Sequence, residues 1–217
     1  MRISLDTKAK VKIGQFSRRG VARGRHAVRA ADHDMHPDAV LAPAGILEVD
    51  ACQLNVIFGT SRDTSDFVAD CLESWWSRRQ GAYPGVRRLL IDLDNGPEIA
   101  SSRTQFMKRL VEFADRTQLT LELAYYPPYH SKYNRIERCW GVLENHWNGA
   151  LLTSIDIALA WARTMTWGGV APIVHLLDRV YETGVKLTKA AFQPIASRLK
   201  RSQTLPKWSL VIQPNAG

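Results

Sequence analysis

The sequence contains little cysteine and no apolar run long enough to cross a membrane. Its three cysteines, Cys52, Cys71 and Cys139, are odd in number, widely separated and unlike any metal-binding spacing. We interpret them as free thiols in a reducing cytoplasm, which excludes a disulfide-stabilised secreted domain. The first residues, MRISLDTKAK, lack the apolar segment of a signal peptide, and this also indicates a cytoplasmic protein.

Several signatures of common enzyme classes are missing as well. There is no phosphate-binding glycine loop, no dinucleotide fingerprint, and no serine or cysteine within a nucleophile motif. His33 and His36 are three residues apart, but no third ligand lies near them in the sequence, so solvated loop residues are favoured over a zinc site. With 217 residues and no repeat, the chain is expected to form one domain with additions.

Positive charge, by contrast, is abundant and unevenly placed. The net charge is +8 with a pI near 9.6, and residues 1–29 alone carry all of it, so residues 30–217 are neutral overall. A basic segment this concentrated favours nucleic acid as a partner over a merely solubilising surface. Its basic residues are Arg2, Lys8, Lys10, Lys12, Arg18, Arg19, Arg23, Arg25 and Arg29.

Hydrophobic patterning predicts an α/β fold. A strand at Arg2–Asp6 and a second at 8–16 would form a hairpin around residues 7–8, followed by a long irregular insertion at 17–48. Strands and helices then alternate, which predicts a mixed five-stranded sheet with helices on both faces. The later elements are strand 53–60, a helix ending before Gly81, strand 86–93, helix 102–116, strand 119–126, a helix from Ser131 or Asn134, helix 155–167, and a strand or packed tail at 205–214.

The segment 125–147, YYPPYHSKYNRIERCWGVLENHW, begins with two prolines that cannot be helical and continues as an amphipathic helix. Glu137 lies in its first turn, about 100° away from the apolar stripe, so its side chain is expected at the edge of a pocket. The alternative is a capping box, because Asn134 and Glu137 have the spacing of N-cap and N3. The stripe itself consists of Ile136, Trp140, Leu143 and Trp147.

Two further acids, Asp6 and Asp94, close strands that can be neighbours, where sites gather in such sheets. Three carboxylates at one place repel one another unless a cation neutralises them, and hard oxygen ligands suit Mg²⁺ or Mn²⁺. Two such ions, about 3.5–4 Å apart, can activate a water or a 3′-hydroxyl against a phosphodiester. The sequence therefore favours metal-dependent chemistry on a nucleic acid.

Each acid also has a structural alternative. Asp6 could belong to a hairpin turn, and Asp94 could close an Asx turn. Asp92 competes with Asp94 from the same face of the strand, about 6.6 Å back, although the strand end is easier for a metal to reach. Glu144 competes with Glu137 but lies about 10 Å further along the helix axis, too far to share ions with the first turn.

The chain resembles the catalytic domain of DDE transposases and integrases, above all bacterial insertion-sequence transposases of the Rhodopirellula-type group, with mariner-like enzymes as more distant relatives. The resemblance implies an RNase H-like fold, with Asp6, Asp94 and Glu137 as catalytic residues that bind two Mg²⁺ or Mn²⁺ ions. Asp94 and Glu137 are separated by 42 residues, a longer gap than in many relatives but one that this group tolerates. The matching motifs are SLDTK at 4–8, SRDTSDF at 61–67, WW at 75–76, LIDLDNG at 90–96 and PPYHSKYNRIE at 127–137.

The resemblance further implies cleavage and strand transfer at the ends of an insertion sequence, on double-stranded DNA near the nucleoid. Residues 1–150 would form the catalytic domain and 151–217 a C-terminal helical extension packed on it. A helix-turn-helix region that reads element ends is expected ahead of such a domain and is absent from this sequence, which suggests a truncated chain or a separately encoded part. A catalytically silent DNA-binding remnant and a general nuclease of the same fold are the alternatives.

Basic residues near the predicted site are candidate DNA contacts, and a homodimer would fit the resemblance. The glycine-rich run that often follows the second acid is replaced here by Asn95-Gly96-Pro97-Glu98, which predicts a stiffer loop. The candidate DNA-binding residues are Lys8, Lys10, Arg18, Arg19, His130, Lys132 and Arg135.

Overall fold

The computed structural model describes residues 1–26, 28–33, 36–127, 130 and 133–215. Within these residues, nine strands form one mixed sheet in the order β7-β4-β3-β1-β5-β6-β9-β8, and β2 pairs with β3 beyond the end of β1. The strands are β1 (Arg2–Thr7), β2 (Val11–Ile13), β3 (Ala39–Glu48), β4 (Gln53–Gly59), β5 (Arg88–Leu93), β6 (Thr120–Tyr125), β7 (Ile173–Leu177), β8 (Leu199–Arg201) and β9 (Ser209–Ile212). The helices are α1 (Ser65–Arg79), η1 (Gln80–Ala82), α2 (Thr104–Thr117), α3 (Arg135–Trp147), α4 (Ile155–Thr164) and α5 (Lys189–Ala196).

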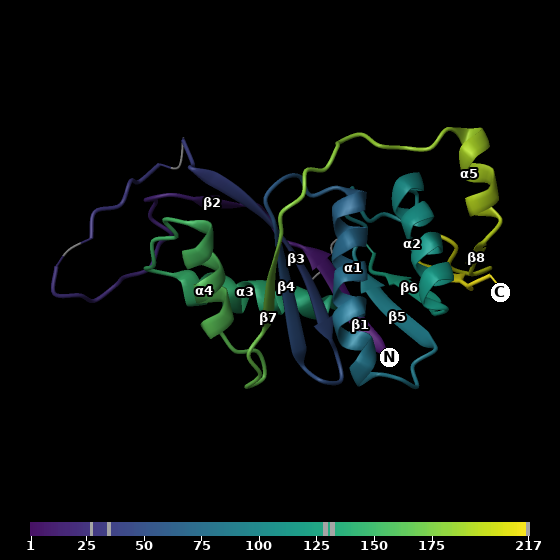
Figure 1. The fold of residues 1–217 in the computed structure, drawn as a ribbon, viewed down its shortest axis with the longest axis horizontal. Helices are drawn as coiled ribbons and strands as arrows, with labels where there is room; N and C mark the ends of the chain where they lie inside the picture. Colours follow the sequence, from purple (N-terminus) through teal and green to yellow (C-terminus); the bar gives the residue numbers. More distant parts are fainter. Residues whose placement is uncertain (27, 34–35, 128–129, 131–132, 216–217) are drawn as a thin grey trace.

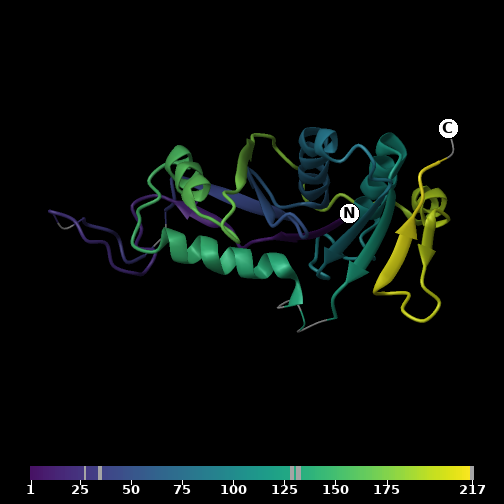
Figure 2. The same ribbon diagram turned by 90° about the horizontal axis from the view of Figure 1, so that it is seen from below.

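The sheet lies between two layers of helices. Helices α1 and α2 cover one face and α3 lies on the other, with α4 packed against α3 and β7 (Figure 2). Alternation along β1 explains the two cores: Ile3 and Leu5 pack with α1 and α2, whereas Ser4 and Asp6 face α3. This mixed α/β architecture, with a many-stranded sheet flanked by helices, is compatible with the predicted RNase H-like class.

Most of the strongly patterned elements are where the sequence predicts them. Strands β1, β4, β5 and β6 and helices α1, α2 and α3 are confirmed, and α4 ends three residues earlier than predicted. Helix α1 begins at a side-chain cap, because Thr64 Oγ1 accepts a hydrogen bond from Phe67 N. The residues of the apolar stripe of α3 are all buried, as predicted.

The predicted hairpin between β1 and β2 is wrong. Both strands pair with β3, one after the other, so the chain keeps its direction instead of turning back (Figure 1). The chain advances four residues from Thr7 to Val11 while β3 advances three, from Ala44 to Leu41. One extra residue on one strand defines a β-bulge, and the Lys8–Lys10 segment supplies it.

The predicted irregular insertion at 17–48 is wrong in its second half, because Ala39–Glu48 forms β3, a central strand. The strand was not predicted because it contains Pro43 and Gly45, two residue types that weaken a strand interior and therefore argue against a strand. In a strand, the N–H and the C=O of one residue point to the same neighbouring strand. Pro43 O accepts a hydrogen bond from Lys8 N (2.9 Å) at the bulge, so the N–H that proline lacks would also have pointed toward the bulge, and proline is tolerated here. The missing donor therefore faces the irregular part of the neighbouring strand.

The segment after residue 150 contributes strands as well as the helices predicted there. Strand β7 extends the sheet beside β4, and the β8–β9 pair extends the opposite side beside β6. Strand β9 confirms the predicted strand within 205–214, whereas β7 and β8 were not predicted. Helix α5 packs against α2 at the outer end of the molecule (Figure 1).

The cysteines are free thiols: Cys52 is exposed, whereas Cys71 and Cys139 are buried. Burial raises the pKa of Cys139 to about 12, so this thiol stays protonated at neutral pH. Among the described helices, none is both long enough and apolar enough to span a bilayer.

Gly45→Ala tests how closely α3 packs on the sheet. A Cβ atom at Gly45 would lie 2.6 Å from both Ile136 Cδ1 and the Trp140 ring, so these side chains or the helix that carries them must shift. We expect this methyl group to lower the free energy of unfolding by about 1–3 kcal/mol. Denaturant unfolding followed by fluorescence measures the change.

Gly141→Ala is the matched control on the same helix. A Cβ at Gly141 meets nothing within 4 Å. This substitution should raise the free energy of unfolding by about 0.5–1 kcal/mol because alanine favours helix more than glycine does. Equal effects at both positions would contradict the close packing.

Candidate active site

Strand register brings the first two acids to the same level of the sheet. Strands β1 and β5 are adjacent and parallel, with Ser4 opposite Asp92. Asp6 and Asp94 each lie two residues further along, so they share a face and a level at the carboxyl ends of their strands. Paired strands are about 4.8 Å apart, which places the two carboxylates within reach of a common ligand.

The third acid is placed by contacts between α3 and β1. Ser4 Oγ accepts a hydrogen bond from Ile136 N (3.0 Å) and donates one to Asn134 Oδ1. Asn134 Nδ2 in turn donates to Leu5 O at 3.3 Å. The start of α3 is therefore capped by a strand residue, and the side chain of Asn134 makes no cap bond of its own, so the capping-box alternative is wrong for Asn134.

A second contact between these elements reaches the acid cluster directly. Trp140 Nε1 donates a hydrogen bond to Asp6 Oδ2 at 2.9 Å. From the sequence Trp140 was predicted as a core residue only and Asn134 as an N-cap, whereas the contacts of Ser4 with α3 were not predicted. One signal was available, because Ser4 is two residues from Asp6 on a strand and therefore shares its face.

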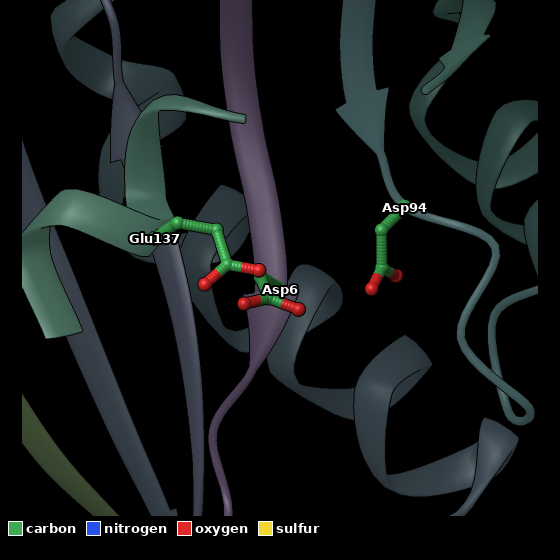
Figure 3. Close-up of side chains that lie close together, drawn as sticks. All are labelled: Asp6, Asp94 and Glu137. Atoms are coloured by element: carbon green, nitrogen blue, oxygen red, sulfur yellow. The ribbon is translucent and has the colours of Figure 1, made fainter. Parts of the chain in front are cut away.

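Asp6, Asp94 and Glu137 converge as the sequence analysis predicted. Each offers one carboxylate oxygen, and these atoms all lie within 4.8 Å of one another. Figure 3 shows Asp6 between Glu137 and Asp94, with its carboxylate directed into the space they share. Asp6 is 5% exposed, whereas Asp94 and Glu137 are partly buried and remain open on one side. The geometry can hold a small cation between hard oxygen atoms.

The electrostatics of the cluster favour such a cation. The pKa of Asp6 is raised to about 7, by burial first and then by the charges of Asp94 and Glu137, against the opposing hydrogen bond from Trp140. Ionising Asp6 therefore costs free energy, because the neighbouring negative charges and the low solvation both disfavour its carboxylate form. A bound divalent ion would remove that cost and displace the proton.

The loop after Asp94 is held in place on both sides. Asp94 Oδ1 accepts a hydrogen bond from Gly96 N (3.0 Å), so Asp94 does form the Asx turn given as its alternative. This turn uses one carboxylate oxygen and leaves the second available as a metal ligand. Glu98 accepts from Ser65 N at the start of α1 (3.1 Å), and Tyr125 Oη donates to Ile99 O (3.0 Å). The predicted stiff loop is therefore tied to α1 and β6.

The two rival acids are engaged elsewhere. Asp92 Oδ2 accepts from Arg2 Nε at 2.8 Å and lies outside the acid cluster. Glu144 pairs with Lys8 and, at 3.3 Å, with Arg18. Burial alone would raise the pKa of Glu144, but the hydrogen bond from Lys8 and the charges of both bases lower it overall. Both rivals are ion-pair partners and lie apart from the three-acid site.

The other predicted DNA contacts are distributed around the site. Lys10 Nζ lies 3.1 Å from Oδ1 of Asp63, in the loop before α1. Arg19 is exposed and has a positive φ of 64°. Arg135 is exposed at the start of α3, and the His130 ring stacks on Tyr133. Lys132 lies outside the described residues, as does Ser131, the earlier candidate for the helix start. DNA binding by all of these residues stays a prediction.

His33 and His36 are both exposed on the loop before β3. In the part of the chain that the structure describes, the three-acid cluster is the one group of three or more potential metal ligands, and neither histidine belongs to it.

Asp6→Asn tests the cost of charge in the site. In the metal-free chain the native state keeps this proton up to about pH 7, whereas the unfolded carboxyl loses it near its ordinary value of 3.8. Asp6 therefore destabilises the fold progressively as the pH rises from about 4 to 7. Asparagine keeps an oxygen for Trp140 without the charge, so the variant should be more stable than the parent above pH 7, by about 1–3 kcal/mol, and no more stable near pH 4.

Denaturant unfolding across this pH range, with and without Mg²⁺, measures the effect. Mg²⁺ should stabilise the parent and leave Asp6→Asn unchanged. Asp50→Asn, in the exposed β3–β4 turn, is the control and should show neither effect. A gain in Asp6→Asn that did not vary with pH would contradict the electrostatic origin.

The chain matches the family model of the Rhodopirellula transposase DDE domain over residues 1–214. No curated protein matches the chain. The match covers nearly the whole sequence and confirms the resemblance found from its motifs. The chain belongs to the Rhodopirellula transposase DDE domain family.

Proposed function

We propose that the chain is a divalent-metal-dependent DNA transposase domain with an RNase H-like fold, which cleaves phosphodiesters and transfers strands at insertion-sequence ends. The observation that carries this proposal is the convergence of carboxylate oxygens from Asp6, Asp94 and Glu137 within 4.8 Å. The family supplies the transposase context, and the basic segment at residues 1–29 supplies affinity for a polyanion.

The donor set fits Mg²⁺ or Mn²⁺. All three side chains offer carboxylate oxygen, with no thiolate or imidazole in the cluster that would favour zinc. Mg²⁺ typically takes one or two protein carboxylates and completes its shell with water and substrate phosphate oxygens. Three carboxylates around one space therefore match a site for two such ions that also binds a phosphodiester.

Each acid is held differently by the chain. Trp140 holds one oxygen of Asp6 by a hydrogen bond, while the Asx turn orients Asp94. Glu137 reaches the cluster from the capped first turn of α3. When bound, the ions would polarise the attacking oxygen and stabilise the leaving oxygen of the phosphodiester.

The reaction would proceed in two displacements at one site. Water attacks phosphorus at the element end, the bond to the 3′ oxygen breaks, and a 3′-hydroxyl is freed. That hydroxyl then attacks a phosphodiester of target DNA in line, loses its proton and displaces the target's 3′ oxygen. In this proposal residues 1–150 carry the catalytic groups and residues 151–217 complete the sheet around them.

Asp94→Asn and Glu137→Gln test the site by loss of metal binding. Each removes one anionic ligand and should weaken Mn²⁺ binding, measured by titration calorimetry, by at least about a hundredfold. Nicking and joining of element-end DNA, followed on gels, should fall below detection in both variants. Asp156→Asn, an exposed acid in the first turn of α4, is the control and should keep both properties.

The outcomes separate the alternatives. DNA binding by the unaltered chain without Mn²⁺ binding would show a catalytically silent remnant. Metal-dependent cutting of unrelated DNA without any joining would show a general nuclease of the same fold.

A further inference from the structure

The loop between β2 and β3 projects from the end of the sheet, away from the acid cluster. Both views show it extending beyond α4 into solvent (Figures 1 and 2). We call residues 17–26 and 28–31 of this loop the basic arm. The segment 17–31 contains five arginines, no acidic residue and no phenylalanine, tyrosine or tryptophan.

The base of the basic arm is fixed to the body of the protein. Its two ends are joined by a hydrogen bond from Ser17 N to Ala31 O at 3.0 Å. Gly149, just after α3, donates its N–H to Arg19 O at 2.8 Å. Gly20 and Gly149 both have positive φ, and a Cβ at Gly20 would lie 2.9 Å from Gly149 N, so the two backbones pack directly on each other. The arm is therefore a structural extension of the α3 end, with its tip free of the core.

Arg18 serves this attachment. Its guanidinium stacks over the Trp147 ring at 5.2 Å and pairs with Glu144 at 3.3 Å. These contacts make Arg18 a positioning residue for the arm, and its predicted contact with DNA stays a prediction.

The distal arginines have the opposite character. Arg23, Arg25 and Arg29 are exposed, and none forms an ion pair within the described part of the chain. Of these three, Arg23 lines a hollow of about 550 Å³ along the arm, together with Arg18, Arg19 and His26 and, among the described residues, with no carboxylate. Such a concave surface of guanidinium groups fits phosphate oxygens.

We propose that the basic arm binds the phosphate backbone of double-stranded DNA through Arg23, Arg25 and Arg29, on DNA that flanks the reacting phosphodiester. This inference rests on the proposed function, in that the chain acts on DNA. Duplex is favoured over single strands because single-strand binding relies on aromatic platforms, which the arm lacks. Arginine side chains without aromatic partners suit the backbone and the narrow minor groove of a duplex.

Helix α3 sets the distance between the two sites. Glu137 lies in its first turn, and the arm is attached at its last residue, Trp147, so the separation along the axis is about 15 Å. Duplex DNA rises about 3.4 Å per base pair, so a duplex that runs along α3 would meet the arm about four base pairs from the scissile phosphate. The arm therefore contacts flanking DNA, while the acids contact the reacting bond.

The triple substitution Arg23→Gln, Arg25→Gln and Arg29→Gln tests the proposal. Binding to a short duplex of arbitrary sequence is measured by fluorescence anisotropy over a range of salt concentrations, in EDTA so that the metal site takes no part. The slope of log K against log salt should decrease in magnitude by about 3, and affinity at low salt should fall at least about tenfold. Because the three side chains are exposed and unpaired, the melting temperature should stay unchanged.

The matched control removes the same charge elsewhere, through Arg78→Gln, Arg87→Gln and Lys186→Gln, all exposed residues outside the arm. A smaller change of slope in the control supports the arm, whereas an equal change in both variants overturns it. A loss confined to single-stranded DNA, with duplex binding intact, also overturns it. If the triple variant keeps the parent's salt slope while the parent cleaves DNA with metal, the proposal for the arm fails and the proposed function stands. If the triple variant loses slope but the parent shows no metal-dependent cleavage, the proposed function fails and the proposal for the arm stands.

Discussion

The hydroxyl of Ser4 caps helix α3 from a neighbouring strand, and the position of the third acid depends on this contact. One hydroxyl can donate one hydrogen bond and accept others, so Ser4 binds Asn134 and Ile136 N at the same time. The contact joins residues 132 apart in the sequence. One turn later, Trp140 is bonded to Asp6. Glu137 lies between these two points, so the helix can neither slide nor rotate without breaking one of them.

Two buried carboxylates show how differently this protein treats the same chemical group. Glu48 is 1% exposed and accepts hydrogen bonds from Arg79, Tyr83, Trp75 and Asn55. Burial would raise the pKa of Glu48, but these bonds, that of Arg79 first, lower it overall. Asp6 is almost as buried, yet its neighbours include two more acids, and its pKa is raised to about 7. The charge of Glu48 is compensated by its hydrogen-bond donors and has a structural role, whereas the charge of Asp6 is not compensated and can be neutralised by a bound cation.

The sequence predicts this site better than it predicts the sheet around it. Acids at strand ends and the periodicity of α3 are local patterns that made Asp6, Asp94 and Glu137 candidates, and the resemblance to DDE transposases selected them over their structural alternatives. Strand β3 could not, because the features that permit Pro43 and Gly45 are a bulge on one neighbour and a helix packed closely above. Ser4 and Trp140 were missed for the same reason, since their partners are more than 130 residues away. A local sequence pattern cannot reveal a contact between residues that are distant in the chain.

The pairing of β7 with β4 and of β9 with β6 has a consequence for the order in which the chain matures. Strands β4 and β6 are apolar and well formed, and without their C-terminal neighbours each would present a row of unpaired backbone groups. The strands that replace them at the margins are short, and the outermost, β8, carries Lys200 and Arg201, which discourage pairing with another molecule. Until β7 and β9 have paired with them, β4 and β6 therefore leave both margins of the sheet open to self-association, and the protein is protected only when both strands are in place.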